Sequence, residues 1–128
     1  MSNYLLELGI SEEEIKRILE INNGLTDYNE YEKNIETLRI LGCSENSIKN
    51  IVISNPNVLI RSNSDIIKLV NYLKTLRLES LNIVFDTNPY LLNKDDFEVE
   101  EFFNKYRKHG LSDEKIIDIF EDKFYDID

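Results

Sequence analysis

Apolar residues recur along this chain at the three- and four-residue spacing that places side chains on one face of a helix. Four segments, which we call the A helices, carry this spacing at Ile15, Ile18 and Leu19; at Ile48, Ile51 and Val52; at Leu81, Val84 and Phe85; and at Ile116, Ile119 and Phe120. Three further segments, the B helices, carry it at Tyr31, Ile35, Leu38 and Leu41; at Ile66, Val70, Leu73 and Leu76; and at Val99, Phe102, Phe103 and Tyr106. The alternation of A and B segments predicts an all-α protein.

Polar residues between these segments predict where the helices begin and end. Three of the A helices follow a Gly, one spacer and a Ser, and the Gly suits the left-handed position after a helix. The three Ser suit the N-cap of the next helix; they are Ser11, Ser44 and Ser112. Asn-Pro pairs close two A helices, because the residue before Pro avoids the α region. The Pro can open a short helical turn that buries Val58-Leu59 or Leu91-Leu92. The expected caps of the B helices are Asp27, Ser64 and Asp95.

These landmarks repeat along the chain. Asn55-Pro56 and Asn88-Pro89 lie 33 residues apart, and neighbouring units are offset by 33–35 residues. The third unit has lost two residues in its turn, where Arg77-Leu78 stands in place of Gly42-Cys43. A helix pair cannot bury its apolar face alone, so we expect the units to stack. The sequence predicts one domain over residues 1–128, with about three units and partial units at both ends.

Bulk composition fits a folded domain. The chain has 128 residues, of which 41% are hydrophobic and 31% charged. No apolar run approaches the roughly 20 residues that span a bilayer, and the first residues lack the basic region of a secretory signal, so we expect no membrane association. The single cysteine, Cys43, cannot form an internal disulfide, which makes the reducing cytoplasm the expected location.

The repeat resembles that of the mitochondrial transcription termination factor (mTERF) family. That family couples a Gly-x-Ser-x-x-x-Ile helix start, a Pro-x-Leu-Leu segment and a second amphipathic helix. The best match here runs from Leu41 to Leu76 and contains Gly42, Ser44, Ile48, Ile51, Pro56, Leu59, Val70, Leu73 and Leu76. The resemblance implies a right-handed solenoid of three-helix units, the third a short 3₁₀ turn after the Pro, with nucleic acid bound on a concave basic face. This chain departs from the pattern at residues 22–26, which lack the Pro, and in its acidity.

No motif for catalysis is present. His109 precedes Gly110 at an expected helix end, where the helix dipole favours a cation. No histidine neighbours Cys43 that would make it a nucleophile. There is no Gly-rich phosphate loop, and one Cys with one His cannot build a zinc site. Acidic runs such as Asp95-Asp96 are expected to cap helices and face solvent. We therefore expect no enzyme activity, no cofactor and no metal.

Charge is unevenly distributed. The net charge is −10, yet residues 38–78 hold six Lys/Arg against two Asp/Glu. Basic residues follow the repeat in two rows: Arg39, Lys74 and Arg107 occupy equivalent places in the B helices, and Arg61 and Lys94 occupy equivalent places before them. Lys49 and Lys68 add charge outside the rows. Rows of cations suit a polyanion, so we hypothesise a non-catalytic module that binds DNA or RNA backbone through these residues.

Two alternatives stay open. The helix dipole by itself favours cations in the last turn of a helix, which would account for the first row. The solenoid surface can instead bind a protein, and an acidic chain would suit a basic partner. Cationic rows on one face without carboxylates would favour nucleic acid, whereas an acidic or apolar face would favour a protein. The sequence does not indicate the oligomeric state.

Overall fold

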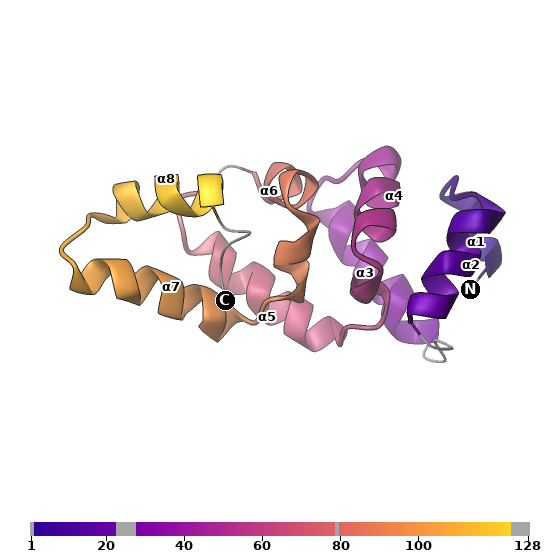
Figure 1. Ribbon diagram of the computed structural model, residues 1–128, viewed down its shortest axis with the longest axis horizontal. Coiled ribbons are helices and arrows are strands. Elements are labelled where there is room, and N and C mark those ends of the chain that lie inside the picture. Colours follow the sequence, from indigo (N-terminus) through magenta and orange to yellow (C-terminus); the bar gives the residue numbers. More distant parts are fainter. Residues whose placement is uncertain (1, 23–27, 79, 124–128) are drawn as a thin grey trace.

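The computed structural model describes residues 2–22, 28–78 and 80–123, and these residues form α-helices and 3₁₀ turns without a β-strand (Figure 1). The α-helices are α1 (Ser2–Glu7), α2 (Glu12–Ile21), α3 (Tyr28–Ile40), α4 (Glu45–Ser54), α5 (Asn63–Lys74), α6 (Leu81–Thr87), α7 (Asp96–Lys108) and α8 (Asp113–Lys123). The 3₁₀ turns are η1 (Pro56–Leu59) and η2 (Pro89–Asn93). The predicted all-α class is confirmed.

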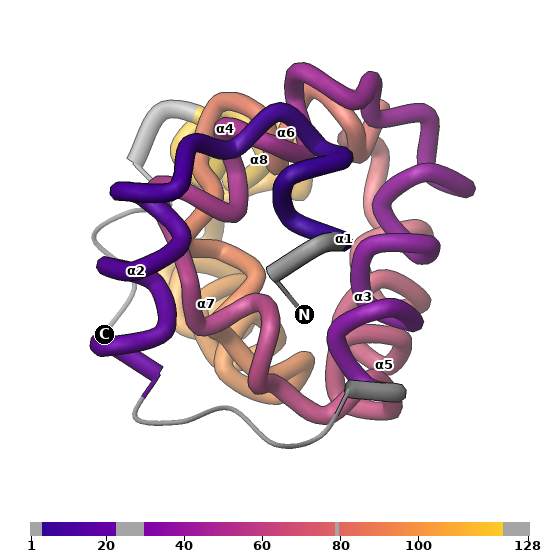
Figure 2. Tube along the Cα trace, turned by 90° about the vertical axis from the view of Figure 1, so that its right-hand side faces the viewer, coloured from indigo at the N-terminus to yellow at the C-terminus, as the bar shows by residue number. Residues whose placement is uncertain are grey.

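The helices stack into an elongated array. Helices α4 and α6, which are A helices, pack on each other, and the B helices α3, α5 and α7 pack in succession. Figure 1 shows α4, α6 and α8 along one long edge and α5 and α7 along the other; Figure 2 views the array from its N-terminal end. Turn η1 packs against α4 and the preceding B helix α3, and turn η2 packs against α6 and α4. Their residues Val58, Leu59, Leu91 and Leu92 are at most 2% exposed. One continuous core runs from Leu5 to Phe120.

Local capping chemistry sets most helix boundaries where the sequence predicted them. The Ser11, Ser44 and Ser112 hydroxyls each accept a hydrogen bond from the backbone N–H three residues later, at 3.2, 3.1 and 3.4 Å. The preceding glycines have φ of +88°, +97° and +82°, which side-chain-bearing residues rarely adopt. Asp95 precedes α7, and its backbone N–H donates to Glu98 Oε1 at 3.0 Å.

The predicted cap of α5 at Ser64 is wrong. Helix α5 begins at Asn63, so Ser64 lies in its first turn. The backbone N–H of Asn63 donates to Glu30 Oε2 of α3 at 2.8 Å, so a neighbouring helix satisfies the group that a local cap would otherwise satisfy. The expected cap at Asp27 lies outside the described residues.

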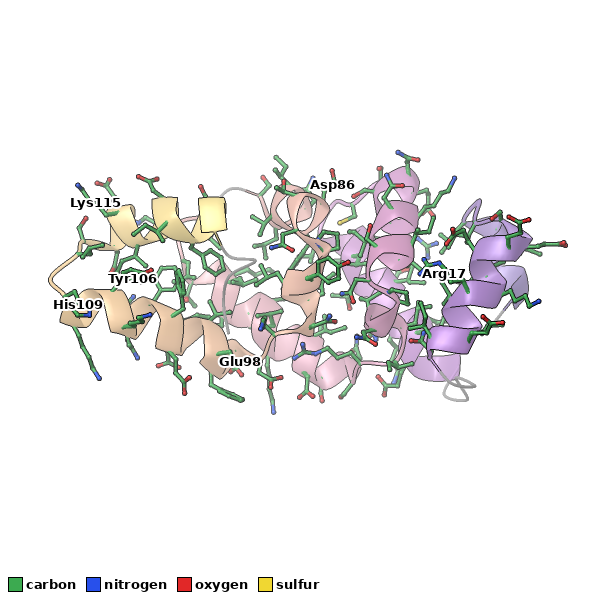
Figure 3. All side chains as sticks on the ribbon, in the orientation of Figure 1. Arg17, Asp86, Glu98, Tyr106, His109 and Lys115 are labelled. Carbon is green, nitrogen blue, oxygen red and sulfur yellow. The ribbon has the colours of Figure 1, made fainter. Side chains whose placement is uncertain are left out.

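Buried asparagines join successive units. Asn22 and Asn55 each follow an A helix, lie 33 residues apart, and are at most 9% exposed. Asn22 Nδ2 donates to the carbonyl of Pro56 at 3.1 Å, and Asn55 Nδ2 donates to the carbonyl of Pro89 at 2.9 Å. The first unit lacks the Pro but keeps the Asn, so its Asn side chain still donates to the Pro carbonyl of the second unit. Arg17 adds a bond to the Ile53 carbonyl at 2.8 Å between α2 and α4 (Figure 3).

The third unit has a shortened A helix. Helix α6 has seven residues, whereas α2 and α4 have ten and α8 has eleven. It begins at Leu81, the equivalent of Ile48, although α4 begins three residues before Ile48. The two missing residues therefore cost α6 its first turn, and the chain from Thr75 to Ser80 connects it to α5.

Candidate nucleic-acid interface

Arg39 and Arg107 hold the same local ion pair in two different units. Each lies in the last turn of a B helix and reaches the first residue of the next A helix, six positions later. Arg39 Nε is 2.8 Å from Glu45 Oε1, and Arg107 Nε is 3.0 Å from Asp113 Oδ1. A second guanidinium nitrogen approaches the other carboxylate oxygen at 3.3 and 3.5 Å respectively. This arrangement ties the end of one helix to the start of the next across the Gly turn.

The ion pairs shift the pKa values of both partners. The hydrogen bond from Arg39 lowers the pKa of Glu45, and the one from Arg107 lowers the pKa of Asp113. Hydrogen bonding to these carboxylates in turn raises the pKa of each arginine. Both guanidinium groups also lie over aromatic rings, Arg39 over Tyr4 at 5.8 Å and Arg107 over Phe103 at 5.6 Å. Each guanidinium group therefore contacts a carboxylate and an aromatic ring of the protein itself.

Arg61 connects two units from a largely buried position. Its side chain is 11% exposed. Nη1 donates to the Leu92 carbonyl at 2.8 Å, and Nη2 lies 2.6 Å from Asp95 Oδ1. Both partners belong to the η2–α7 segment of the next unit, 31 and 34 residues away. The repeat-equivalent residue Lys94 is 26% exposed and lies 3.9 Å from Glu98 Oε2. The second row is therefore a set of ion-paired residues in the loops before α5 and α7.

Lys74 differs from the arginines of its row. The residue six positions after it is Ser80, so the carboxylate that pairs with Arg39 and Arg107 has no counterpart there. Lys74 is exposed at the end of α5, and Lys68 is exposed on the same helix. Lys49 is half-buried on α4, with its Cδ 3.9 Å from where a Cβ on Gly9 would lie. None of these three lysines lies within ion-pair distance of a carboxylate among the residues described.

The exposed positions of α5 include no carboxylate, and its one acidic residue, Asp65, is half-buried in the first turn. Its exposed positions are Ser64, Ile67, Lys68, Asn71 and Lys74. The neighbouring B helices differ: α3 exposes Glu32 and Glu36, and α7 exposes Glu100 and Glu101. Of the seven candidate residues, Lys68 and Lys74 are exposed on α5, where the one carboxylate, Asp65, is half-buried. Four others are held in ion pairs: Arg39, Arg61, Lys94 and Arg107.

Groups that could support other chemistry are placed unfavourably. His109 is exposed at the α7–α8 turn, at the end of the array (Figure 3). Cys43 is 7% exposed, and burial raises the pKa of its thiol, which disfavours the nucleophilic thiolate. The described part of the chain contains no group of three His, Cys, Asp or Glu side chains able to hold a metal ion. None of the described helices is long and apolar enough to cross a bilayer.

Comparison with known proteins identifies the family. The mTERF family model matches residues 1–122, nearly the whole chain. The chain belongs to the mTERF family. Searches of curated proteins and of solved structures found no match to it. The mTERF family is a helical-repeat family known for nucleic-acid binding and is generally non-catalytic. The resemblance carried by the Gly-x-Ser, Asn-Pro and Leu-Leu landmarks is thus confirmed.

Sequence reasoning missed the contacts between units of this mTERF-family chain. Asn34 is fully buried, and its Nδ2 donates to the carbonyls of Val58 and Arg61 at 2.8 and 2.7 Å. Asn63 Nδ2 donates to Asn34 Oδ1 at 2.9 Å. A polar residue at a helix position flanked by core residues is the available signal, since Asn34 precedes Ile35 and lies four positions before Leu38. The six-residue spacing from Arg39 to Glu45 and from Arg107 to Asp113 was visible in the sequence as well.

Proposed function

We propose that this mTERF-family protein binds the phosphate backbone of a nucleic acid through the exposed surface of α5, with Lys68 and Lys74 as the contacting cations. Family membership supports a nucleic-acid ligand. The exposed positions of α5 include Lys68 and Lys74 and no carboxylate, and this is the single observation that favours this location. Lysine ammonium groups that are not already paired can neutralise phosphates and release their condensed counterions.

The ion-paired arginines contribute little to this proposed surface. A phosphate that contacts Arg39 would displace Glu45 or share the guanidinium with it. Arg61 is mostly covered by the next unit, so a ligand could not reach it without separating η2 from the loop before α5. Neutral and polar neighbours such as Asn71 on α5 can donate further hydrogen bonds to phosphate or sugar oxygens. The proposed interface is therefore smaller than the two rows expected from the sequence.

Salt-dependent binding tests this proposal. We would measure fluorescence anisotropy of labelled duplex DNA and labelled single-stranded RNA against the full chain at several salt concentrations. The double variant Lys68→Ala/Lys74→Ala should lower the slope of log K against log salt by about 2, one for each lost phosphate contact. The matched control is Lys105→Ala/Lys108→Ala, which removes two exposed lysines from α7.

The outcomes separate clearly. Equal slopes for the α5 variant and the unmodified chain would refute the assignment of Lys68 and Lys74. An equal reduction in both double variants would indicate that overall charge, and not the α5 surface, governs binding. The absence of binding to either nucleic acid at low salt would refute a nucleic-acid function.

We also propose the finer architecture: a right-handed solenoid of three units with partial units at both ends, forming a single domain in the cytoplasm. The contacts between residues 34 positions apart support equivalent stacking of successive units. A crystal structure would test the handedness and the number of units. A left-handed superhelix or unequal stacking would contradict this architecture.

A further inference from the structure

The junction between the third unit and α8 differs from the earlier junctions of the array. A Cβ placed on Gly9 would lie 3.9 Å from Lys49, and one placed on Gly42 would lie 3.8 Å from Asn82, so each turn closely approaches the next A helix. The equivalent turn before α6 has Arg77 where the others have Gly, and α6 lacks its first turn. Less protein is therefore available at this junction to fill the space beside α8.

A cleft of about 1020 Å³ lies at this junction. It is bounded by the end of α5 and the connection that follows it, by one side of α7, and by one side of α8. Its volume is at the upper end of the roughly 300–1,000 Å³ typical of ligand pockets. Figure 1 shows α7 and α8 as the helical hairpin that closes this end of the array.

The walls of the cleft are acidic. On α8, Glu114, Asp118 and Glu121 lie at the three- and four-residue spacing that places them on one side of the helix, and all three line the cleft. Glu100 of α7 lies on the other wall. Like charges at this spacing destabilise a helix slightly, so the stripe has a cost in the isolated chain. A concave wall of one charge also concentrates the field and attracts ions of opposite sign.

The cations of the cleft do not cancel this charge. Two cations line the cleft, Arg77 and Arg107, and Arg107 is paired with Asp113. Within the described residues no Lys or Arg forms an ion pair with Glu100, Glu114 or Asp118. The potential in the cleft is therefore negative, and a nucleic acid would be repelled from it.

Apolar groups line the cleft between the charges. Leu76, Leu78 and Ile117 are half-buried and contribute to its wall, as does the half-buried ring of Tyr72. Water at such a surface is displaced favourably by an apolar side chain. The cleft therefore offers apolar contacts together with carboxylates. A small inorganic cation would contact the carboxylates and leave the apolar side chains uncovered.

We infer that the cleft between the α5–α6 connection and α8 docks an extended segment of a partner protein in which Arg or Lys side chains alternate with apolar ones. The cationic side chains pair with Glu114 and Asp118 of α8 and Glu100 of α7. The apolar side chains cover Leu78 and Ile117. Charge complementarity requires a positively charged partner. The apolar wall favours a peptide with apolar side chains over a simple polycation. The docking is independent of the α5 surface proposed for nucleic acid.

Peptide binding to the full chain tests this inference. The probe is fluorescein-labelled Arg-Leu-Arg-Leu-Arg-amide, measured by anisotropy at low salt, with Glu-Leu-Glu-Leu-Glu-amide and Arg-Gly-Arg-Gly-Arg-amide for comparison. The variant Glu114→Gln/Asp118→Asn should weaken binding by about 3- to 30-fold, the loss expected for two ion pairs. The control Glu13→Gln/Glu20→Gln removes the same charge from exposed positions of α2 and should leave binding almost unchanged.

Several results would overturn the inference. They are no binding of the Arg-Leu peptide at millimolar concentration, equal weakening in both double variants, or equal affinity for the acidic peptide. Equal affinity for the Arg-Gly peptide would show that the apolar side chains contribute nothing to binding. It would therefore refute a protein segment with alternating apolar residues as the occupant. Circular dichroism of each variant checks that the helices are retained. The Lys68→Ala/Lys74→Ala variant should bind the peptide normally, so failure of the nucleic-acid proposal would leave this result unaffected.

Discussion

The basic residues that follow the repeat could serve to stabilise the fold or to bind a ligand. Replacing Arg61 by Ala is the substitution that best distinguishes these two roles. The side chain spans two units, with one nitrogen 2.8 Å from the Leu92 carbonyl and another 2.6 Å from Asp95 Oδ1. Its removal leaves that carbonyl without its charged donor in a segment whose leucines are buried. We therefore predict that Arg61→Ala destabilises the fold.

The magnitude follows from the two bonds and their exposure. A hydrogen bond that involves a charged group contributes about 1.5–3 kcal/mol net. Asp95 is 40% exposed and is solvated again when Arg61 is removed, so the ion pair adds little to the cost. The expected loss in the free energy of unfolding is about 2–3 kcal/mol. Arg61→Lys should lose roughly half as much, since one ammonium group cannot reproduce the two-nitrogen fork.

Urea unfolding followed by circular dichroism measures this loss. With a urea dependence of about 2 kcal/mol per molar, the midpoint should fall by about 1–1.5 M. Lys94→Ala is the matched control, because Lys94 is the repeat-equivalent residue and its contact with Glu98 spans 3.9 Å; its midpoint should move by less than about 0.3 M. An unchanged midpoint for Arg61→Ala, together with weakened nucleic-acid binding, would refute our interpretation and restore Arg61 as a phosphate contact.

Three further predictions follow from other contacts. Asn55→Asp removes the donor to the Pro89 carbonyl at a site 1% exposed, and it should lower the free energy of unfolding in urea at neutral pH by about 2–3 kcal/mol. The control Asn57→Asp, at an exposed position, should lower it by under about 0.5 kcal/mol. Equal losses would contradict the bond between units. Because Arg39 lowers the pKa of Glu45, this pair stabilises the fold above the unfolded-state pKa and less as pH falls through the folded one. The difference in stability between the unmodified chain and Glu45→Gln should therefore be under about 1 kcal/mol near pH 7 and vanish near pH 2; a difference that grows with acid would contradict it. Gly42→Ala should cost about 1–2 kcal/mol in thermal unfolding because φ is +97°, and a neutral result would contradict the left-handed turn.

The sequence predicted the helices well because their signals are local. Ser44 caps α4 through a bond that spans three residues, and Pro56 ends that helix by its own ring geometry, so neither depends on the rest of the fold. Ser64 failed as the predicted cap because the backbone N–H of Asn63 is satisfied by Glu30 of α3. That bond forms only after α3 and α5 pack, and periodicity carries no information about it.

The candidate site was less predictable for the same reason. The register of the basic residues was visible, but the partner of Arg61 lies 34 residues further along the chain and becomes a neighbour only through stacking. The acidic cleft lies beside the connection that is two residues shorter before α6. The sequence showed that loss, yet only the packed array shows that α8 is left with an acidic wall facing the resulting space.

Residue-resolved NMR titration tests most directly whether the α5 surface, and not the two rows of ion-paired cations, contacts nucleic acid. Uniformly ¹⁵N-labelled protein would be titrated at low salt with a short DNA duplex and with a short single-stranded RNA. We predict that amide shifts concentrate on α5, at Lys68, Asn71 and Lys74, and that the loop containing Arg61 changes little. Shifts confined to the acidic end at α7 and α8, or no shifts with either nucleic acid, would contradict the proposal.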